Sequence, residues 1–307
     1  MQVTAGMVKE LRELSGAGMS ACKNALVEAS GDIKRATEIL REKGLAAAAK
    51  KAGRVAAEGL VATVISADGK KGAIVEVNSE TDFVAKNKEF VAFVKQVAVE
   101  ALNSDVKTVD ALLEKKWTPD TTQTVKDILT NKVATIGENI GIRRFEKYDA
   151  SGRIVDYIHG GGRIGVMLEI TADEINDAVF EAGRNVCMQI AAMSPQYLDR
   201  SSVSKEYLAN EKEILTQQAN NENAESDKPK PAQVIEKMVE GRLSKQLKEI
   251  CLLDQEYVKE DKKTVAEYLK SVGSGTKIVR FTRYEKGEGI EKKEEDFAAE
   301  VQKAMNV

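Results

Sequence analysis

The residues that could carry out covalent chemistry are few. The 307-residue chain has a single histidine, His159, and His159-Gly160-Gly161-Gly162 is similar to the oxyanion motif of some esterases. The G-x-S-x-G sequence that would supply a nucleophile does not occur, so we interpret the glycines as a turn and keep a hydrolase built on His159 as a distant alternative. Gly273–Lys277 has the wrong spacing for a phosphate-binding loop, and the acidic residues show no metal-loop pattern. We therefore expect no catalytic residue, no metal site and no cofactor.

Binding without covalent chemistry is indicated by the polar stretch Asn78–Asn87, in which Asp82 stands beside Phe83. The stretch follows Gly72–Val77, whose alternating apolar residues predict a β-strand, and it precedes a helical pattern that begins near Lys88. An aromatic ring in such a connection usually packs into the core. The alternative is that Asp82 and Phe83 contact a partner protein.

The composition limits the class of protein. Lys and Arg number 46 against 49 Asp and Glu, and the net charge of −3 does not favour a general nucleic-acid binder. The three cysteines lie far apart without metal-ligand spacing, as in a reducing compartment. The chain shows neither a secretory leader nor an apolar run long enough to cross a bilayer. We expect a cytoplasmic protein of two or three domains that contacts neither nucleic acid nor membrane.

Residues 4–44 have the pattern of three short helices. The apolar stripe of the first helix ends at Leu14, and Gly31-Asp32 separates the second helix from the third. Gly44 fits the position that follows a helix C-terminus, so Leu45–Glu58 is predicted to be an exposed linker with some helical tendency. About forty residues are marginal for an independent fold, and the unit is therefore predicted to be a docking module.

The next part of the chain contains a repeat. A shift of 93 positions aligns the glycines and one glutamate of the first copy with those of the second without a gap. Asp68-Gly69 and Gly161-Gly162 are hairpin turn signals, so each copy is predicted to open with a β-hairpin. A helical stripe and a closing strand follow in each copy. The aligned residues are Gly59, Gly69, Gly72 and Glu76 with Gly152, Gly162, Gly165 and Glu169.

The closing strands, Arg144–Tyr148 and Arg280–Tyr284, are 136 positions apart, so the second copy holds 43 additional residues. Two amphipathic patterns separated by Lys228–Pro231 predict a projecting helical hairpin there. The predicted fold class is multidomain α+β, with small antiparallel sheets covered by helices on one face. The predicted parts are 1–58 (three helices and linker), 59–150 (first copy), 151–203 with 248–285 (second copy), 204–247 (hairpin) and 286–307 (C-terminal module with a helix).

The repeat also bears on the two interpretations of Phe83. If Phe83 packed inward, Ser79 or Thr81 would cap the following helix and the fold would need a similar pair in the second copy. The second copy has Ile175 at the position of Asp82 and an asparagine at that of Phe83. The repeat therefore favours a partner-binding role for Asp82 and Phe83.

Several motifs, in order, resemble those of the bacterial elongation factor Ts family over nearly the whole chain. They are Val8–Arg12 with Gly16–Met19, Ala48–Ala52, Asn78–Asn87, Ile136–Ile140, His159–Gly165, and Lys286–Glu291 with Asp296–Val301. The resemblance implies a guanine-nucleotide exchange factor for elongation factor Tu that performs no covalent chemistry and is not an enzyme. It also implies that the N-terminal unit is similar to ubiquitin-associated domains.

The resemblance assigns roles to residues. Thr81-Asp82-Phe83-Val84 would enter the nucleotide-binding domain of elongation factor Tu and displace Mg²⁺. The other partner contacts implied are Arg12, Met19, Ile136, Gly137, His159 and Phe297. Related proteins differ in the inserted hairpin, which some use to self-associate, so the oligomeric state does not carry over. The competing hypothesis is an adaptor or chaperone that uses the three-helix unit to hold helices without exchanging nucleotide.

Overall fold

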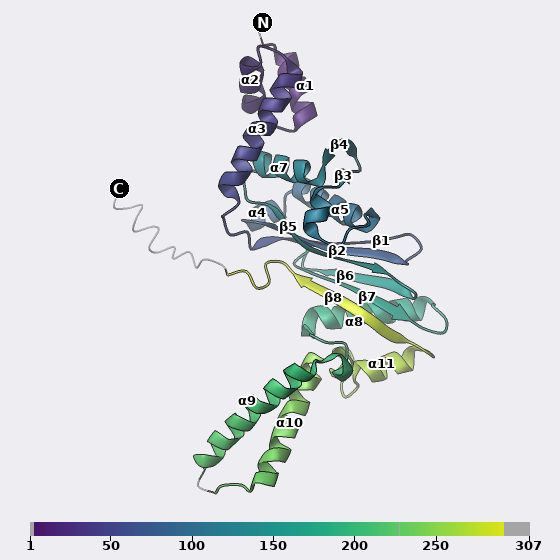
Figure 1. Ribbon diagram of the computed structural model, residues 1–307. Coiled ribbons are helices and arrows are strands. Elements are labelled where there is room, and N and C mark those ends of the chain that lie inside the picture. The colour runs from purple at the N-terminus through teal and green to yellow at the C-terminus, as the bar shows by residue number, and fades with distance from the viewer. Residues whose placement is uncertain (1–2, 227, 292–307) are drawn as a thin grey trace.

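The computed structural model describes residues 3–226 and 228–291 and begins with three packed helices (Figure 1). Their bounds are α1 Ala5–Ser15, α2 Met19–Glu28 and α3 Ile33–Lys51. The side chains of Thr4 and Asp32 cap α1 and α3, and Gly16 ends α1 in the left-handed conformation with φ 67°. The small core between the helices consists of Leu11, Cys22, Ala25, Leu26, Ala29, Ala36 and Ile39.

Two predictions for this region are wrong. Helix α3 does not end at Gly44 but continues to Lys51, because Ala46–Ala49 favour helix and Gly44 allows close packing on α7 (Val125–Ile136). A Cβ atom added at Gly44 would lie 3.6 Å from the Cβ of Ala134. The predicted linker is therefore partly helix. Leu14 is not in the core but 63% exposed, because it faces the open cleft between the three helices and α7.

Two three-stranded antiparallel sheets form the centre of the molecule (Figure 1). Both predicted hairpins are present, and they pair in the same register once the shift of 93 positions is applied. Each central strand has a bulge directly after a buried glutamate, Glu76 or Glu169. The strands are β1 Glu58–Ile65, β2 Lys71–Ser79 and β5 Gly141–Asp149 in the first sheet, and β6 Arg153–His159, β7 Ile164–Thr171 and β8 Lys277–Glu285 in the second.

The two sheets contact each other reciprocally. The amide of Val61 donates to the carbonyl of Gly162 at 2.8 Å. The amide of Ile154 donates to the carbonyl of Gly69 at 2.9 Å, and this pair corresponds to the first by the same shift. The sheets are therefore related by an approximate two-fold arrangement. The side chains buried between them are Val61, Ile74, Tyr148, Ala150, Ile154 and Met167.

A long helix covers the outer face of each sheet. Helix α5 (Lys88–Asn103) buries Phe90, Phe93, Val94, Val97 and Ala101 on the first sheet, as the sequence pattern predicts. Helix α8 (Asp177–Met193) covers the second sheet, although Met193 at its end is 48% exposed. The remaining short elements are α4 Asp82–Ala85, α6 Val109–Leu113, β3 Lys116–Trp117, β4 Asp120–Thr124, η1 Arg200–Ser202, η2 Leu252–Asp254 and α11 Val265–Val272.

Two helices occupy the segment for which the sequence predicts a helical hairpin. Helices α9 (Lys205–Ala224) and α10 (Ala232–Ile250) project from the second sheet, at the opposite end of the molecule from α1–α3 (Figure 1). Leu215, Ala219 and Val239 are buried between them. Within residues 3–226 and 228–291, the structure has no helix with the length and apolar character needed to cross a bilayer.

Candidate functional site

The connection between β2 and α5 presents Phe83 to solvent. Residues Asp82–Ala85 form a single helical turn, α4, and Thr81 caps it by accepting a hydrogen bond from the amide of Val84 at 3.4 Å. Val84 is half-buried against the hydrophobic core that the first sheet and α5 share. Phe83 is 80% exposed, more than any other large apolar side chain in the described part of the chain. The interpretation that Phe83 packs into the core is therefore wrong.

A carboxylate beyond the end of α7 anchors this connection. Glu138 follows Gly137, which ends α7 in the left-handed conformation with φ 89°. One oxygen of Glu138 accepts hydrogen bonds from the amides of Glu80 and Thr81, both at 3.0 Å, and the other accepts from the hydroxyl of Thr81 at 2.6 Å. The carboxylate of Glu80 in turn accepts from the amide of Asn139 at 2.5 Å. The residues before α4 are thus fixed, while the turn itself projects outward.

The charges beside Phe83 are also exposed. Lys86 donates to Asp82 at 2.6 Å, one helical turn along. This hydrogen bond is the main reason that the pKa of Asp82 lies below its ordinary value, and the charge of Lys286 acts in the same direction. Asp82 is therefore a carboxylate at neutral pH. Because exposed ion pairs contribute little to stability, Asp82 can exchange Lys86 for a donor on a partner.

The corresponding connection of the second sheet is built differently. It has no helical turn, and Asn176, at the position of Phe83, caps α8 instead. The amide of Asp173, at the position of Glu80, donates to the backbone carbonyl of Ser274 at 3.2 Å. Ile175 is 37% exposed. The second copy therefore closes the same fold without a projecting aromatic ring.

His159 lies at the end of β6, and in the described chain its ring makes no hydrogen bond with a serine, threonine or cysteine. Its ring nitrogen Nδ1 is 3.1 Å from the hydroxyl of Tyr157. The amides of Gly162 and Arg163 donate to the carbonyl of His159 at 3.2 and 3.1 Å, which closes the β6–β7 turn. Because these amides serve the turn, they do not form an oxyanion hole. His159 remains an exposed side chain that is available to a partner.

The other predicted contact residues are spread over the molecule. Ile136 and Gly137 directly precede the anchoring carboxylate, so they lie beside the connection that carries Phe83. Arg12 and Met19 are exposed on α1 and α2, in the three-helix unit at one end of the molecule (Figure 1). Phe297 lies outside the described residues.

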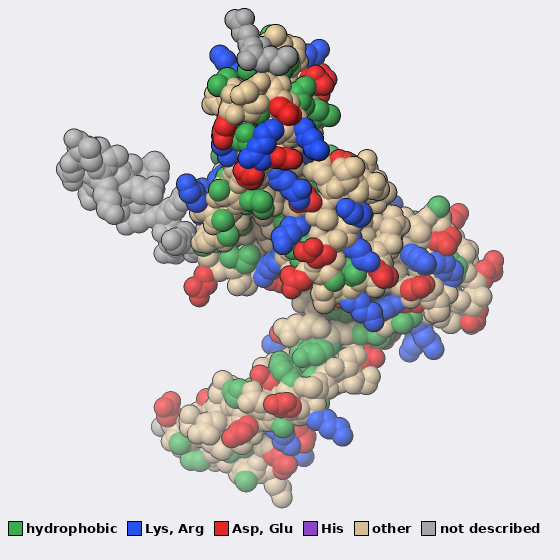
Figure 2. Space-filling model, turned by 45° about the horizontal axis from the view of Figure 1, so that its top comes forward, with side chains coloured by type: hydrophobic (Ala, Val, Ile, Leu, Met, Phe, Trp, Pro, Cys, Tyr) green, Lys and Arg blue, Asp and Glu red, His purple; other side chains and the backbone are tan. Residues whose placement is uncertain are grey.

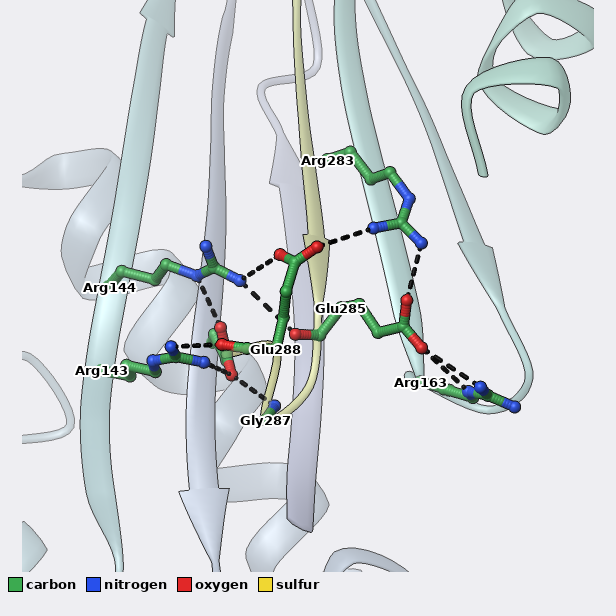
Figure 3. A network of polar contacts seen from close by, with 8 residues as sticks. Arg143, Arg144, Arg163, Arg283, Glu285, Gly287 and Glu288 are labelled. Atoms are coloured by element: carbon green, nitrogen blue, oxygen red, sulfur yellow. Dashed lines mark hydrogen bonds and ion pairs between the residues drawn. The ribbon is translucent and has the colours of Figure 1, made fainter. Parts of the chain in front are cut away.

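The end of the described chain is tied to the first sheet by a buried carboxylate (Figure 3). Glu76 is fully buried and accepts hydrogen bonds from Arg143 at 3.0 Å, from Arg144 at 2.6 Å and from the amide of Gly287 at 2.8 Å. Arg144 also pairs with Glu288 at 3.1 Å. Residues 286–291 are therefore held against the sheet that carries the Phe83 connection.

Glu169 is the counterpart of Glu76 in the second sheet. Burial alone would raise its pKa, but hydrogen bonds from the amide of Gly152 (3.2 Å) and from Arg280 (2.9 Å) outweigh burial, so the pKa lies below its ordinary value. The guanidinium of Arg280 lies 4.1 Å from the ring centre of Tyr148 in the first sheet. Arg144 is the counterpart of Arg280 in the first sheet, and its guanidinium lies 4.1 Å from the ring centre of Tyr284. The two buried carboxylates thus help to hold the sheets together.

The described surface offers groups suited to protein contact. Lys and Arg side chains are interspersed with Asp and Glu over the face in Figure 2, without a large patch of one sign. Among the described residues, no three His, Cys, Asp or Glu side chains gather as metal ligands, and all three cysteines are buried. An exposed ring flanked by charges is an arrangement typical of a protein interface.

Comparison with known proteins decides the family. The family model described as elongation factor TS matches residues 80–288, beginning at the first residue of the Phe83 connection. The elongation factor Ts of Clostridium perfringens is 54% identical over 306 residues, which is 98% of each chain. That of Clostridium novyi is 52% identical over 309 residues, 99% of each chain. The chain belongs to the elongation factor Ts family.

Family membership confirms the predicted function and partner. Elongation factor Ts is a nucleotide-exchange factor for elongation factor Tu in translation elongation and performs no covalent catalysis. The same relationship to bacterial elongation factors Ts confirms the cytoplasmic location expected from the sequence. Self-association through the hairpin stays a prediction.

The sequence did not single out the residues that anchor the Phe83 connection. Glu138 is 57 positions from Thr81, and neither residue shows by its type or periodicity that the two are in contact. The available signal is that Glu138 lies within Ile136–Ile140, one of the motifs that carry the family resemblance, but this motif does not show what the carboxylate contacts. Long-range hydrogen bonds of this kind are visible only in the folded structure.

Proposed function

We propose that Phe83 is the side chain that drives nucleotide exchange, by entering the nucleotide-binding domain of elongation factor Tu. The observation that carries this proposal is the 80% exposure of Phe83 on a turn whose base is fixed by Glu138. An exposed phenyl ring does not stabilise the free protein, whereas an aromatic anchor buried in an interface contributes roughly 2 kcal/mol or more. The exposure of the ring therefore supports the proposal that it binds a partner.

The proposed mechanism acts on Mg²⁺, which belongs to elongation factor Tu. Mg²⁺ requires nearly octahedral oxygen ligands, so a small displacement of an element that carries one ligand weakens the binding of the ion and of the phosphates that it holds. The ring of Phe83 would displace such an element. Asp82 would accept a hydrogen bond from it in place of Lys86, Thr81 caps the turn, and Val84 fixes the turn on the core.

Thermodynamic linkage makes the effects of this chain and of GDP on each other's binding to elongation factor Tu reciprocal. If this chain weakens the binding of GDP to elongation factor Tu, GDP must weaken the binding of this chain by the same factor. Nucleotide-free elongation factor Tu is then the form bound most tightly, and GTP or GDP releases the chain. Exchange follows without any change in a covalent bond.

The remaining predicted contacts would extend the interface. We assign 1–58 to a module that resembles ubiquitin-associated domains and holds a helix of the nucleotide-binding domain, with Arg12 and Met19 on its exposed surface. Ile136 and Gly137 would add to the contact around Phe83, and His159 would face another domain of elongation factor Tu.

The proposed division of the rest of the chain follows the repeat. Residues 59–150 would form one subdomain and 151–203 with 248–285 the other, since each range supplies one sheet and its covering helix. Residues 204–247 would form the projecting hairpin, which self-association would use. Residues 286–307 would form a C-terminal module, of which 292–307, including Phe297, lie outside the described residues.

The experiment is stopped-flow release of fluorescent GDP from elongation factor Tu, with the wild-type chain and with Phe83→Ala. We expect Phe83→Ala to slow release by one or two orders of magnitude, the effect of losing an interface anchor of roughly 2 kcal/mol, while binding through 1–58 persists in part. Release as fast as with the wild type would refute the proposal. An adaptor that does not exchange nucleotide would instead bind elongation factor Tu equally with and without GDP.

A further inference from the structure

We propose that Glu138 is a positioning residue for nucleotide exchange: it holds the turn that presents Phe83 without contacting the partner's nucleotide site itself. The inference rests on the proposed function of Phe83. It assigns a part in exchange to a side chain that lies 55 positions further along the chain than Phe83, in the loop between α7 and β5.

The contacts of Glu138 are concentrated on the start of the turn. Its two oxygens accept three hydrogen bonds, from the amides of Glu80 and Thr81 and from the hydroxyl of Thr81. Hydrogen bonds to a charged acceptor are stronger than those between neutral groups. Thr81 is also the cap of α4, so Glu138 fixes the residue from which the helical turn begins.

Glu138 is itself held in place by its neighbours. Gly137 ends α7 in the left-handed conformation, and Asn139 binds both the carboxylate of Glu80 and, at 2.8 Å, the backbone carbonyl of Arg54. The segment that follows α7 therefore joins the chain before β1 to the Phe83 connection. A ring presented from such a fixed base loses less conformational entropy on binding than one on a mobile loop.

The second copy provides an internal comparison. The shift of 136 positions that relates the closing strands places Ser274 at the position of Glu138. There the amide of Asp173 donates to the backbone carbonyl of Ser274, and no helical turn follows. The fold can therefore close this connection without a carboxylate. The carboxylate is present in the copy that has the projecting turn.

The test combines Glu138→Ala with Phe83→Ala in the full-length chain and measures stopped-flow release of fluorescent GDP from elongation factor Tu. We expect Glu138→Ala to reduce the maximal release rate roughly fivefold to twentyfold, less than Phe83→Ala does, because the ring is displaced but not removed. In the Phe83→Ala background, Glu138→Ala should change the rate by less than about twofold, because residues that act as a unit are not additive.

The matched control is Glu267→Ala. Glu267 accepts hydrogen bonds from the amide and hydroxyl of Thr264 at the start of α11, so it resembles Glu138 in chemistry but lies in the second copy. Its removal should leave the release rate within about twofold of the wild type. Circular dichroism melting of every variant verifies folding, and Glu138→Gln, which retains one acceptor oxygen, should be intermediate.

Three outcomes would overturn the inference: a wild-type rate with Glu138→Ala, an equal loss from Glu138→Ala with and without Phe83, or the same loss with Glu267→Ala. Failure of the proposed function is distinguishable, because Phe83→Ala alone would then release GDP at the wild-type rate.

Discussion

The two connections that leave the central strands occupy equivalent places in two sheets of the same register, yet they present different surfaces. In the first, a helical turn exposes Phe83 and a carboxylate anchors its base. In the second, Asn176 caps the next helix directly and a backbone carbonyl replaces the carboxylate. The same fold accommodates both connections, so the sheet itself does not require the helical turn of the first copy. The difference supports the proposed role of the turn in binding elongation factor Tu.

The largest effect is expected from making the first connection like the second. Replacing residues 80–83 by the sequence of 173–176 removes the Thr81 cap and the Phe83 ring and keeps Asn87, the cap of α5. The replacement should slow release of fluorescent GDP by about a hundredfold, as expected when an interface loses its central anchor. Stopped-flow fluorescence measures the rate, and circular dichroism verifies the fold. A chimera that exchanges nucleotide normally would show that the two connections are interchangeable.

A smaller effect should distinguish the two equivalent hairpin turns. A Cβ at Gly162 (φ 99°) would lie 2.6 Å from Leu60, whereas one at Gly69 (φ 70°) would meet only the flexible side chain of Arg153 at 3.2 Å. We expect Gly162→Ala to lower the free energy of unfolding by about 2 kcal/mol and Gly69→Ala by about 1 kcal/mol. Urea unfolding followed by circular dichroism measures both. Equal losses would contradict the difference in packing.

The smallest effect concerns pH. The pKa of Glu169 in the folded protein lies below its ordinary value, so its ionised form contributes stability above the unfolded pKa, and that contribution is lost as the pH falls through the folded value. Glu169→Gln should therefore cost about 1 kcal/mol at pH 7, and the cost should shrink below about pH 4.5. Unfolding of both proteins between about pH 3 and 7 measures it, and a cost independent of pH would refute this prediction.

Much of the fold could be predicted from the sequence, because its signals are local. Hairpin turns are marked by glycines such as Gly69, and the buried stripe of α5 repeats with the helical period. The end of α3 could not be predicted, because Gly44 looks like a helix end and only its packing on α7 shows why the helix continues. The exposure of Leu14 depends likewise on tertiary packing.

The candidate site was predictable in part for the same reason. Comparison of the two copies identified Phe83 as a residue that the fold does not require, and its exposure agrees with that inference. Glu138 was not identified, because its role depends on hydrogen bonds between segments that the sequence does not bring together. A repeat shows which residues differ between copies but not what holds them.

The most direct test of the proposed role of Phe83 is photocrosslinking to elongation factor Tu. A photoreactive phenylalanine analogue is placed at position 83. As a control it is placed at position 175, the exposed apolar residue of the second connection, where it leaves the α8 cap Asn176 intact. The crosslinked peptides are identified by mass spectrometry. We predict crosslinks from position 83 to the nucleotide-binding domain of elongation factor Tu, and none to that domain from position 175. A complex that forms without a crosslink from position 83 to that domain would contradict the proposed role.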